Sequence, residues 1–131
     1  MRSTASLAFI TGSLLLTACG GSDSSQPETA GPAVARKEVG ETRDALKAAL
    51  QTYKGGDAAA AQEQVAEAYV SHFEEVEQPL DAKDHELKES LEHAISDDLR
   101  ADMKAGRSPA AVEARVDKIV ADLDKAEAAL R

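Results

Sequence analysis

Four stretches of the chain repeat apolar residues at the spacing of an α-helix, and this pattern limits the fold more than any other feature of the sequence. In the last stretch the steps alternate between four and three, as in a helix that packs lengthwise on others. That seam consists of Val112, Val116, Ile119, Leu123, Ala126 and Leu130. No stretch alternates apolar and polar residues as a strand does, so the sequence predicts an all-α fold.

Residues that favour helix ends separate the four patterns. Gly55-Gly56 closes the first, Pro79 closes the second and Gly106 closes the third. Asp57 and Ser108 are good N-cap residues for the helices that follow them. The predicted helices span residues 36–54, 57–78, 84–105 and 109 onward. Short connections favour antiparallel neighbours, so we expect residues 36–131 to form an antiparallel up-down-up-down four-helix bundle.

The two middle patterns differ from the last in their spacing. The second stripe consists of Ala61, Val65, Tyr69, Val76 and Leu80, and His72 lies within it. The third repeats every four residues and consists of Leu87, Leu91, Ile95, Leu99 and Met103. Because an α-helix has about 3.6 residues per turn, a strict four-residue repeat drifts around it. We therefore expect the third helix to cross its neighbours at an angle.

The first residues of the chain predict where the protein works. Arg2 precedes a mostly apolar stretch, residues 7–16, which is shorter than the roughly 20 residues of a membrane-spanning helix and is typical of a secretory signal. Leu16-Thr17-Ala18-Cys19 resembles the lipobox of bacterial lipoproteins, whose cysteine carries a diacylglycerol after the signal is cut off. We expect residues 1–18 to be a signal peptide and Cys19 to be lipidated. An ordinary signal with a chance cysteine is the alternative.

These features place the expected protein outside the cytoplasm, anchored by lipid to the cell membrane. Residues 19–35 contain Gly, Ser and Pro without apolar periodicity, so we expect a flexible linker there. Loss of Arg2 with the signal would change the net charge from −9 to −10, and such a surface repels nucleic acid. Cys19 is the only cysteine, so its acylation would leave no thiol for catalysis or metal binding.

The sequence lacks the common signatures of enzymes. It has no glycine-rich phosphate loop, nucleophile elbow or His-Glu-x-x-His zinc motif, so we expect no enzymatic activity. Carboxylates and imidazoles remain, and these side chains bind hard or borderline cations. His72 and Glu75 are three residues apart on one side of the second predicted helix. Glu74 and Glu77 have the same spacing on a more exposed side, and these four residues are the candidate metal ligands.

The predicted bundle gathers acidic residues at one end. Folding each helix about its connection places His72 level with about Val39 on the first helix. The same end would hold Glu38, Glu41, Glu74, Glu75, Glu77, Asp81, Asp84, Glu86, Glu89, Asp122, Asp124 and Glu127. The alternatives are a solvated acidic face and, for His72, a buried imidazole hydrogen-bonded to a neighbouring carboxylate.

Two further groups of charged residues are expected to be structural. His85, Glu89, His93 and Asp97 form a stripe opposite the apolar side of the third helix, which we interpret as a wet face with a transition-metal site as the alternative. Asp98 and Asp102 lie closer to the core side. Arg100 and Arg115 are their expected ion-pair partners.

Residues 42–131 resemble a known family. The matching motifs are Tyr53-Lys54-Gly55-Gly56-Asp57, Ala68-Tyr69, Phe73-Glu74-x-x-Glu77, Glu92-x-x-Ile95, Leu99-Arg100, Met103, Gly106, Val112 and Ala126-Glu127-x-x-Leu130. Their order and spacing resemble the extracytoplasmic helical domain that precedes the membrane part of bacterial permeases of the high-affinity iron transporter family. The chain departs from that family because it has no transmembrane helices and no Arg-Glu-Gly-Leu-Glu motif.

The resemblance implies a helical module outside the membrane that works near an iron transporter. It also implies that Glu74 and Glu77 contact iron. On this basis we expect an accessory protein of iron uptake, anchored to the cytoplasmic membrane by lipid, that captures or buffers an iron ion. Its expected partner is an iron permease or another uptake component, and nucleic acid is not one. The alternative is a metal-free acidic helical adaptor that docks a membrane or periplasmic protein.

Overall fold

The computed structural model describes residues 31–131, and helices make up 87% of them. No strand occurs among the described residues, so the predicted all-α fold is confirmed. The predicted signal peptide, the lipidation site Cys19 and most of the predicted linker lie outside this part of the chain.

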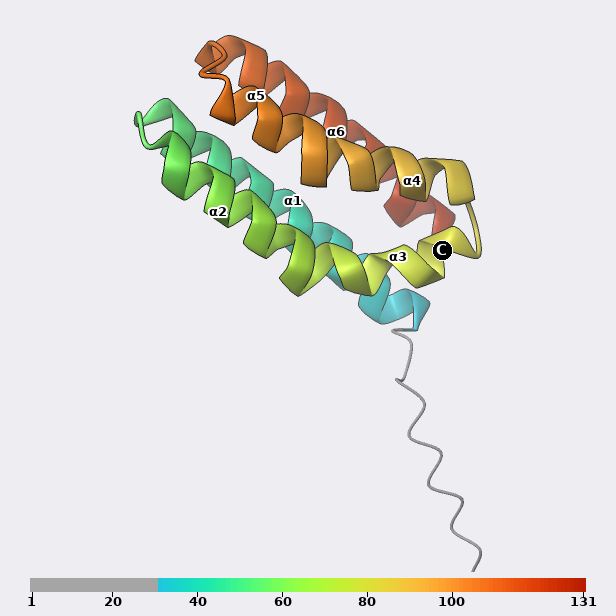
Figure 1. Cartoon of the computed structure of the whole chain (residues 1–131). Coiled ribbons are helices and arrows are strands. Elements are labelled where there is room, and N and C mark those ends of the chain that lie inside the picture. Colours follow the sequence, from blue (N-terminus) through green and yellow to red (C-terminus); the bar gives the residue numbers. More distant parts are fainter. Residues whose placement is uncertain (1–30) are drawn as a thin grey trace, which may run out of the picture.

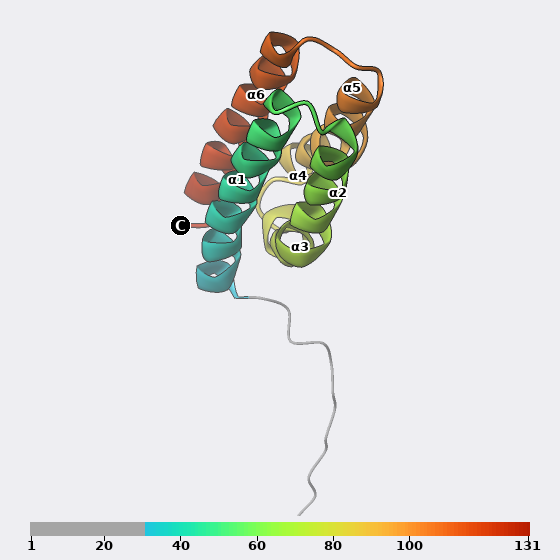
Figure 2. The same ribbon diagram turned by 90° about the vertical axis from the view of Figure 1, so that its left-hand side faces the viewer.

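Four helical segments make up the domain (Figure 1). The first is α1 (Pro32–Lys54) and the last is α6 (Pro109–Ala129). The second segment consists of α2 (Ala58–Ala68), a π-helical turn η1 (Tyr69–Phe73) and α3 (Glu74–Asp81). The third consists of α4 (His85–His93), a second π-helical turn η2 (Ala94–Leu99) and α5 (Arg100–Lys104). Figure 2 shows α1 between α6 on one side and α2 on the other.

Two helix boundaries differ from the sequence-based ones. Helix α1 begins at Pro32, so residues 32–35 of the predicted linker are helical. Proline is favourable at a first helical position, and Ala35 in the next turn is buried. Helix α3 continues through Pro79 to Asp81, although proline cannot donate the usual intrahelical hydrogen bond. The burial of Leu80 offsets this loss, because its side chain is fully enclosed by the core.

The predicted helix caps are present. The side chain of Asp57 accepts a hydrogen bond from the backbone N–H of Ala60 at 3.0 Å, and that of Ser108 accepts one from Ala111 at 3.3 Å. At the end of α5, Gly106 has a φ of +66°, and the N–H of Arg107 reaches back to the carbonyl of Asp102 at 3.1 Å. This left-handed glycine cap fixes where the chain leaves α5 and enters the connection to α6.

Two glycine-to-alanine substitutions should therefore have opposite effects. Gly106→Ala is expected to lower the free energy of unfolding by about 1 kcal/mol, because an L-residue is strained at positive φ. Gly40→Ala is expected to raise it by about 0.5–1 kcal/mol, because position 40 lies inside α1 and an added Cβ would meet no atom within 4 Å. Urea unfolding followed by circular dichroism measures both, and a stabilising Gly106→Ala would contradict the capping role.

All four helical segments contribute to one hydrophobic core. Its largest fully buried side chains are Phe73, Leu46, Leu80, Leu91, Ile95, Leu99, Met103, Ile119, Leu123, Leu130, Val39 and Val65. The whole predicted seam of α6 is buried, which confirms the clearest pattern in the sequence.

The π-helical turn η1 changes which residue of the second segment enters the core. A π-turn closes i→i+5 hydrogen bonds and so holds about one residue more than an α-turn. The buried residues therefore step by five across it, from Ala68 to Phe73. Phe73 is fully buried, whereas Tyr69 and His72 of the predicted stripe are only partly buried. The expected place of His72 in the apolar stripe was wrong because it assumed an uninterrupted α-helix.

The second π-turn, η2, lies within the four-residue repeat of the third segment. Leu91, Ile95, Leu99 and Met103 are all buried, and Leu87 is partly buried. The extra residue in η2 takes up the drift that a strict four-residue repeat has on an α-helix. The repeat thus signals a π-turn, which the sequence-based interpretation as a crossing helix did not include.

Candidate functional site

The candidate ligand His72 pairs with a carboxylate of another helix. Its Nδ1 donates to Oε2 of Glu38 on α1 at 2.8 Å. The Glu38 side chain is only 14% exposed and also lies 3.2 Å from Nζ of Lys37. The predicted level of His72 near residue 39 is therefore confirmed to within one residue. This pairing agrees with the alternative interpretation, an imidazole held by a neighbouring carboxylate.

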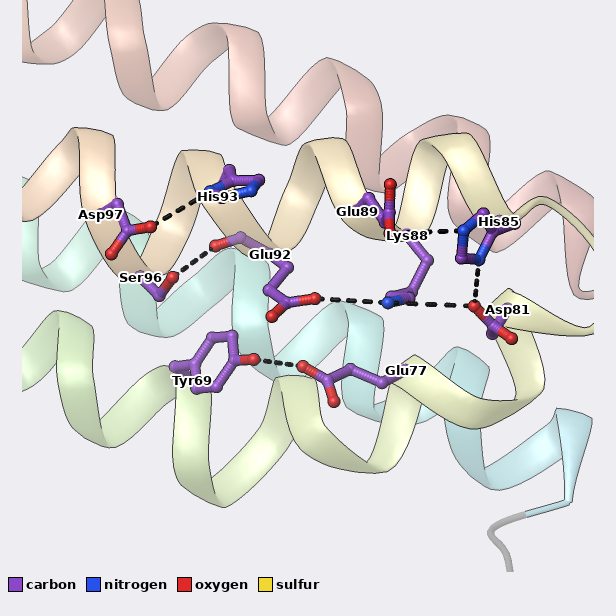
Figure 3. A network of polar contacts seen from close by, with 10 residues as sticks. All are labelled: Tyr69, Glu77, Asp81, His85, Lys88, Glu89, Glu92, His93, Ser96 and Asp97. Carbon is purple, nitrogen blue, oxygen red and sulfur yellow. Dashed lines mark hydrogen bonds and ion pairs between the residues drawn. The ribbon is translucent and has the colours of Figure 1, made fainter.

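The candidate ligand Glu77 is engaged on the opposite side of its helix. It accepts a short hydrogen bond from the hydroxyl of Tyr69 (Figure 3). Burial and then this hydrogen bond raise the pKa of Tyr69 well above its ordinary value of 10.0, so the phenol stays protonated and donates. Tyr69 and Glu77 are eight residues apart, and they align because the chain between them passes through η1, which contains one residue more than an α-turn.

The structure does not assemble the four candidate ligands into one site. His72 turns to α1 and Glu77 to Tyr69, while Glu74 and Glu75 are exposed. Among residues 31–131, no group of three or more His, Cys, Asp or Glu side chains is arranged to hold a metal ion.

A polar groove lies between α3 and α4 beside this region. Glu77, Gln78, Asp81 and Lys88 line a cavity of about 290 Å³. Nζ of Lys88 lies 3.3 Å from Oε2 of Glu92 and 3.8 Å from Oδ1 of Asp81, as Figure 3 shows. The lysine ammonium thus supplies a positive charge among these acids, where a metal site would need an open position.

Basic side chains also neutralise part of the predicted acidic end. Nη2 of Arg43 lies 2.7 Å from Asp124 and 3.0 Å from Glu127, and the pKa of Glu127 is lowered chiefly by its hydrogen bond to Arg43. Asp122 is buried and accepts hydrogen bonds from Lys118 at 2.9 Å and Lys125 at 2.7 Å. The spacing of these lysines, four before and three after Asp122, was a sequence signal for the pairs.

The two further groups of charged residues form ion pairs, although one expected partner, Arg100, takes no part. Arg115 contacts Asp98 at 3.1 Å and Asp102 at 3.0 Å, whereas Arg100 is exposed and pairs with neither. His85 and His93 are exposed. His85 pairs with Glu89 one turn along its helix and with Asp81 at the end of α3, and His93 pairs with Asp97. These contacts are typical of a solvent-exposed helix face (Figure 3).

The pair of Glu38 and His72 should make the free energy of unfolding depend on pH. The hydrogen bond from His72 holds the pKa of Glu38 below its ordinary value of 4.5. The stabilisation is therefore present above pH 4.5 and is lost as the pH falls through the folded-state pKa. Between about pH 5.5 and about pH 3, a Glu38→Gln variant should lose less unfolding free energy than the parent protein, measured by urea titration. Glu41→Gln, which alters an exposed neighbour, is the control and should follow the parent.

Comparison with known proteins identifies no relative, since no family model, curated protein or solved structure matches the chain. The resemblance to the iron permease domain therefore rests on the quoted motifs alone. In the part of the chain that the structure describes, no helix is long and apolar enough to cross a membrane.

Proposed function

We propose that this protein is an acidic helical adaptor, tethered by lipid outside the cytoplasm, that docks a basic surface of a partner protein. The observation that carries the proposal is an acidic outer face on the second helical segment. It consists of Glu63, Glu67, Glu74 and Glu75, all exposed, together with Val70. Val70 is 59% exposed, and Val34 is the other large apolar side chain that is exposed among residues 31–131.

The carboxylates of the acidic outer face form no ion pairs with the rest of the described chain. Glu63, Glu74 and Glu75 have no ion-pair partner within residues 31–131, and Glu67 accepts only from the hydroxyl of Ser71 on the same helix. Several acids elsewhere are paired, as Glu38, Asp122 and Glu127 illustrate. Unpaired carboxylates around an exposed apolar side chain suit a complementary basic surface with an apolar centre.

Partner capture tests this proposal. The lipidated protein, cross-linked in membranes, should capture a protein whose association weakens with salt and persists in the presence of a chelator. A variant with Glu63→Gln, Glu67→Gln and Val70→Ser should lose it. A control with Asp44→Gln and Asp117→Gln, at exposed sites on α1 and α6, should retain it. Equal loss in both variants would show that only total charge matters, which would defeat the proposal.

Iron capture for an uptake system is the second candidate function. Glu74 and Glu75 are exposed and unpaired, and Glu74 belongs to the Glu-x-x-Glu pair that the resemblance relates to iron contact. The engagement of His72 and Glu77 by other side chains makes this candidate the weaker one. The partner in this case would be an iron permease or another uptake component.

Calorimetric titration of the protein with Fe³⁺ and Fe²⁺ separates the two candidates. Iron capture requires binding that a Glu74→Ala, Glu77→Ala double variant weakens and a Glu63→Ala, Glu67→Ala variant does not. The adaptor proposal expects no difference between these variants, which remove the same number of carboxylates.

The tether and the helix arrangement belong to the same proposal. Labelling of cells with a palmitate precursor, with and without Cys19→Ala, tests the lipid anchor.

We infer that the domain is the antiparallel up-down-up-down bundle. Three pairs along α1 and α6 support this, because Arg36 contacts Leu130, Arg43 contacts Glu127 and Lys54 contacts Glu113. Residue numbers increase along α1 as those of their partners on α6 decrease, so the two helices run antiparallel.

A further inference from the structure

A basic cavity lies where α5 leads into α6, away from the acidic outer face. Its volume is about 320 Å³, and its lining is Asp102, Arg107, Ala111, Ala114, Arg115 and Lys118. Its lining holds three cationic side chains and one carboxylate, and Asp98 and Asp122 also pair with Arg115 and Lys118. The connection between α5 and α6 lies at the end of the domain opposite the start of α1 (Figures 1 and 2).

Carboxylates behind the cavity hold its two guanidinium groups. Asp102 is 16% exposed and lies 3.0 Å from Nε of Arg115 and 3.5 Å from Nε of Arg107. Asp98 lies 3.1 Å from Nη1 of Arg115. Within residues 31–131, Nη2 of Arg115 and both Nη atoms of Arg107 make no hydrogen bond. The acids thus orient the arginines while several of their N–H donors remain available.

The backbone that carries Arg107 is fixed from two sides. Its carbonyl accepts a hydrogen bond from the hydroxyl of Tyr53 on α1 at 2.5 Å, and its N–H donates to the carbonyl of Asp102 at 3.1 Å. Gly106 supplies the left-handed residue that this cap requires. The cavity is therefore built on contacts from α1, α5 and α6.

We propose that this cavity binds the phosphate group of a small phosphate or phosphate monoester. The Nη groups of Arg107 and Arg115 that remain free can donate hydrogen bonds to the oxygens of a phosphate group. Lys118, which also pairs with Asp122, adds a third cation, and Ala111 and Ala114 offer an apolar wall to the remainder of the molecule. The volume is that of a small-molecule site. The inference is independent of the adaptor function.

Binding of inorganic phosphate and of glycerol 2-phosphate tests the proposal. We expect the full chain, held in neutral detergent, to bind at least one of them in calorimetric titration. An Arg107→Gln, Lys118→Gln variant, which leaves Arg115 and its carboxylates in place, should bind at least about tenfold more weakly. A Lys47→Gln, Lys83→Gln variant changes the charge equally at exposed sites elsewhere and should bind within about twofold of the parent.

A second arm identifies the source of the phosphate group. The Cys19→Ala chain, which lacks the lipid site, is sedimented with phosphatidylglycerol vesicles and with neutral phosphatidylcholine vesicles. Loss of binding in the Arg107→Gln, Lys118→Gln variant supports the site, for a free phosphate in the first arm or for a lipid headgroup in the second. Absence of binding in both arms, or equal weakening by the Lys47→Gln, Lys83→Gln control, would overturn it.

Discussion

Deletion of Asp117 from α6 is expected to abolish cooperative folding, whereas deletion of Ser71 from η1 is expected to leave the domain folded. Removing one residue from an α-helix rotates everything beyond it by about 100°. In α6 this turns Ile119, Leu123 and Leu130 away from the core that now encloses them. Each such displacement costs about 2–5 kcal/mol, so together they cost about as much as the 5–15 kcal/mol of stability typical of a domain.

The deletion of Ser71 differs because η1 already contains one residue more than an α-turn. Without Ser71, the step from Ala68 to Phe73 becomes four residues, and an uninterrupted α-helix keeps both in the core. The Ser71 hydroxyl donates an exposed hydrogen bond to Glu67 at 2.6 Å, and its removal should cost little because water can replace it. Circular dichroism and urea unfolding of the two deletion variants measure the contrast. Unfolding of both would show that the π-turn does not set the phase of the helix.

Truncation of Phe73 should have the largest effect of a single substitution in the second helical segment. Phe73→Ala is expected to lower the free energy of unfolding by about 3–5 kcal/mol, because the ring is fully buried and its removal leaves a cavity. Val70→Ala removes an apolar side chain from the same π-turn at a position that is 59% exposed, so its effect should stay within about 0.5 kcal/mol.

A third variant, His72→Ala, tests whether η1 determines which side chain is buried. If η1 were an α-turn, His72 would face the core and Phe73 would lie at the edge of the core. His72→Ala would then lower the free energy of unfolding more than Phe73→Ala. His72→Ala should instead remove a partly exposed hydrogen bond with Glu38 and cost less than Phe73→Ala. Chemical unfolding of the three variants gives the order, and a larger destabilisation by His72→Ala would contradict the assigned burial.

The number of helices, their caps and most of their core were predictable from sequence because they depend on local signals. Asp57, Ser108 and Gly106 act within one turn of their own positions. The π-turns were not predicted, because their signal is ambiguous. His72 continues the stripe at α-helical spacing, and Phe73 continues it only if one extra residue is allowed. The burial of one rather than the other depends on how four helical segments pack together.

The sequence predicted how far along the bundle His72 lies, but it did not predict toward which helix each candidate side chain points. Short connections placed His72 beside residue 39, and Glu38 is indeed its partner. Which side of the helix each acid occupies depends on η1, so the sequence did not predict that Glu77 pairs with Tyr69. The basic cavity was not predicted because Arg107 and Arg115 come together only through the turn at Gly106 and the packing of α6 on η2.

The hydrogen bond from Arg36 to the carbonyl of Leu130 has a consequence for chain connectivity. It joins the first turns of α1 to the end of α6 at 2.8 Å. Because these two points are neighbours in space, a short covalent bridge can link them without moving either helix. The chain can then be opened at Gly55 and Gly56, which lie exposed in the turn between α1 and α2. Such a circular permutant should keep the packing of every helix while its chain ends lie at the opposite end of the domain.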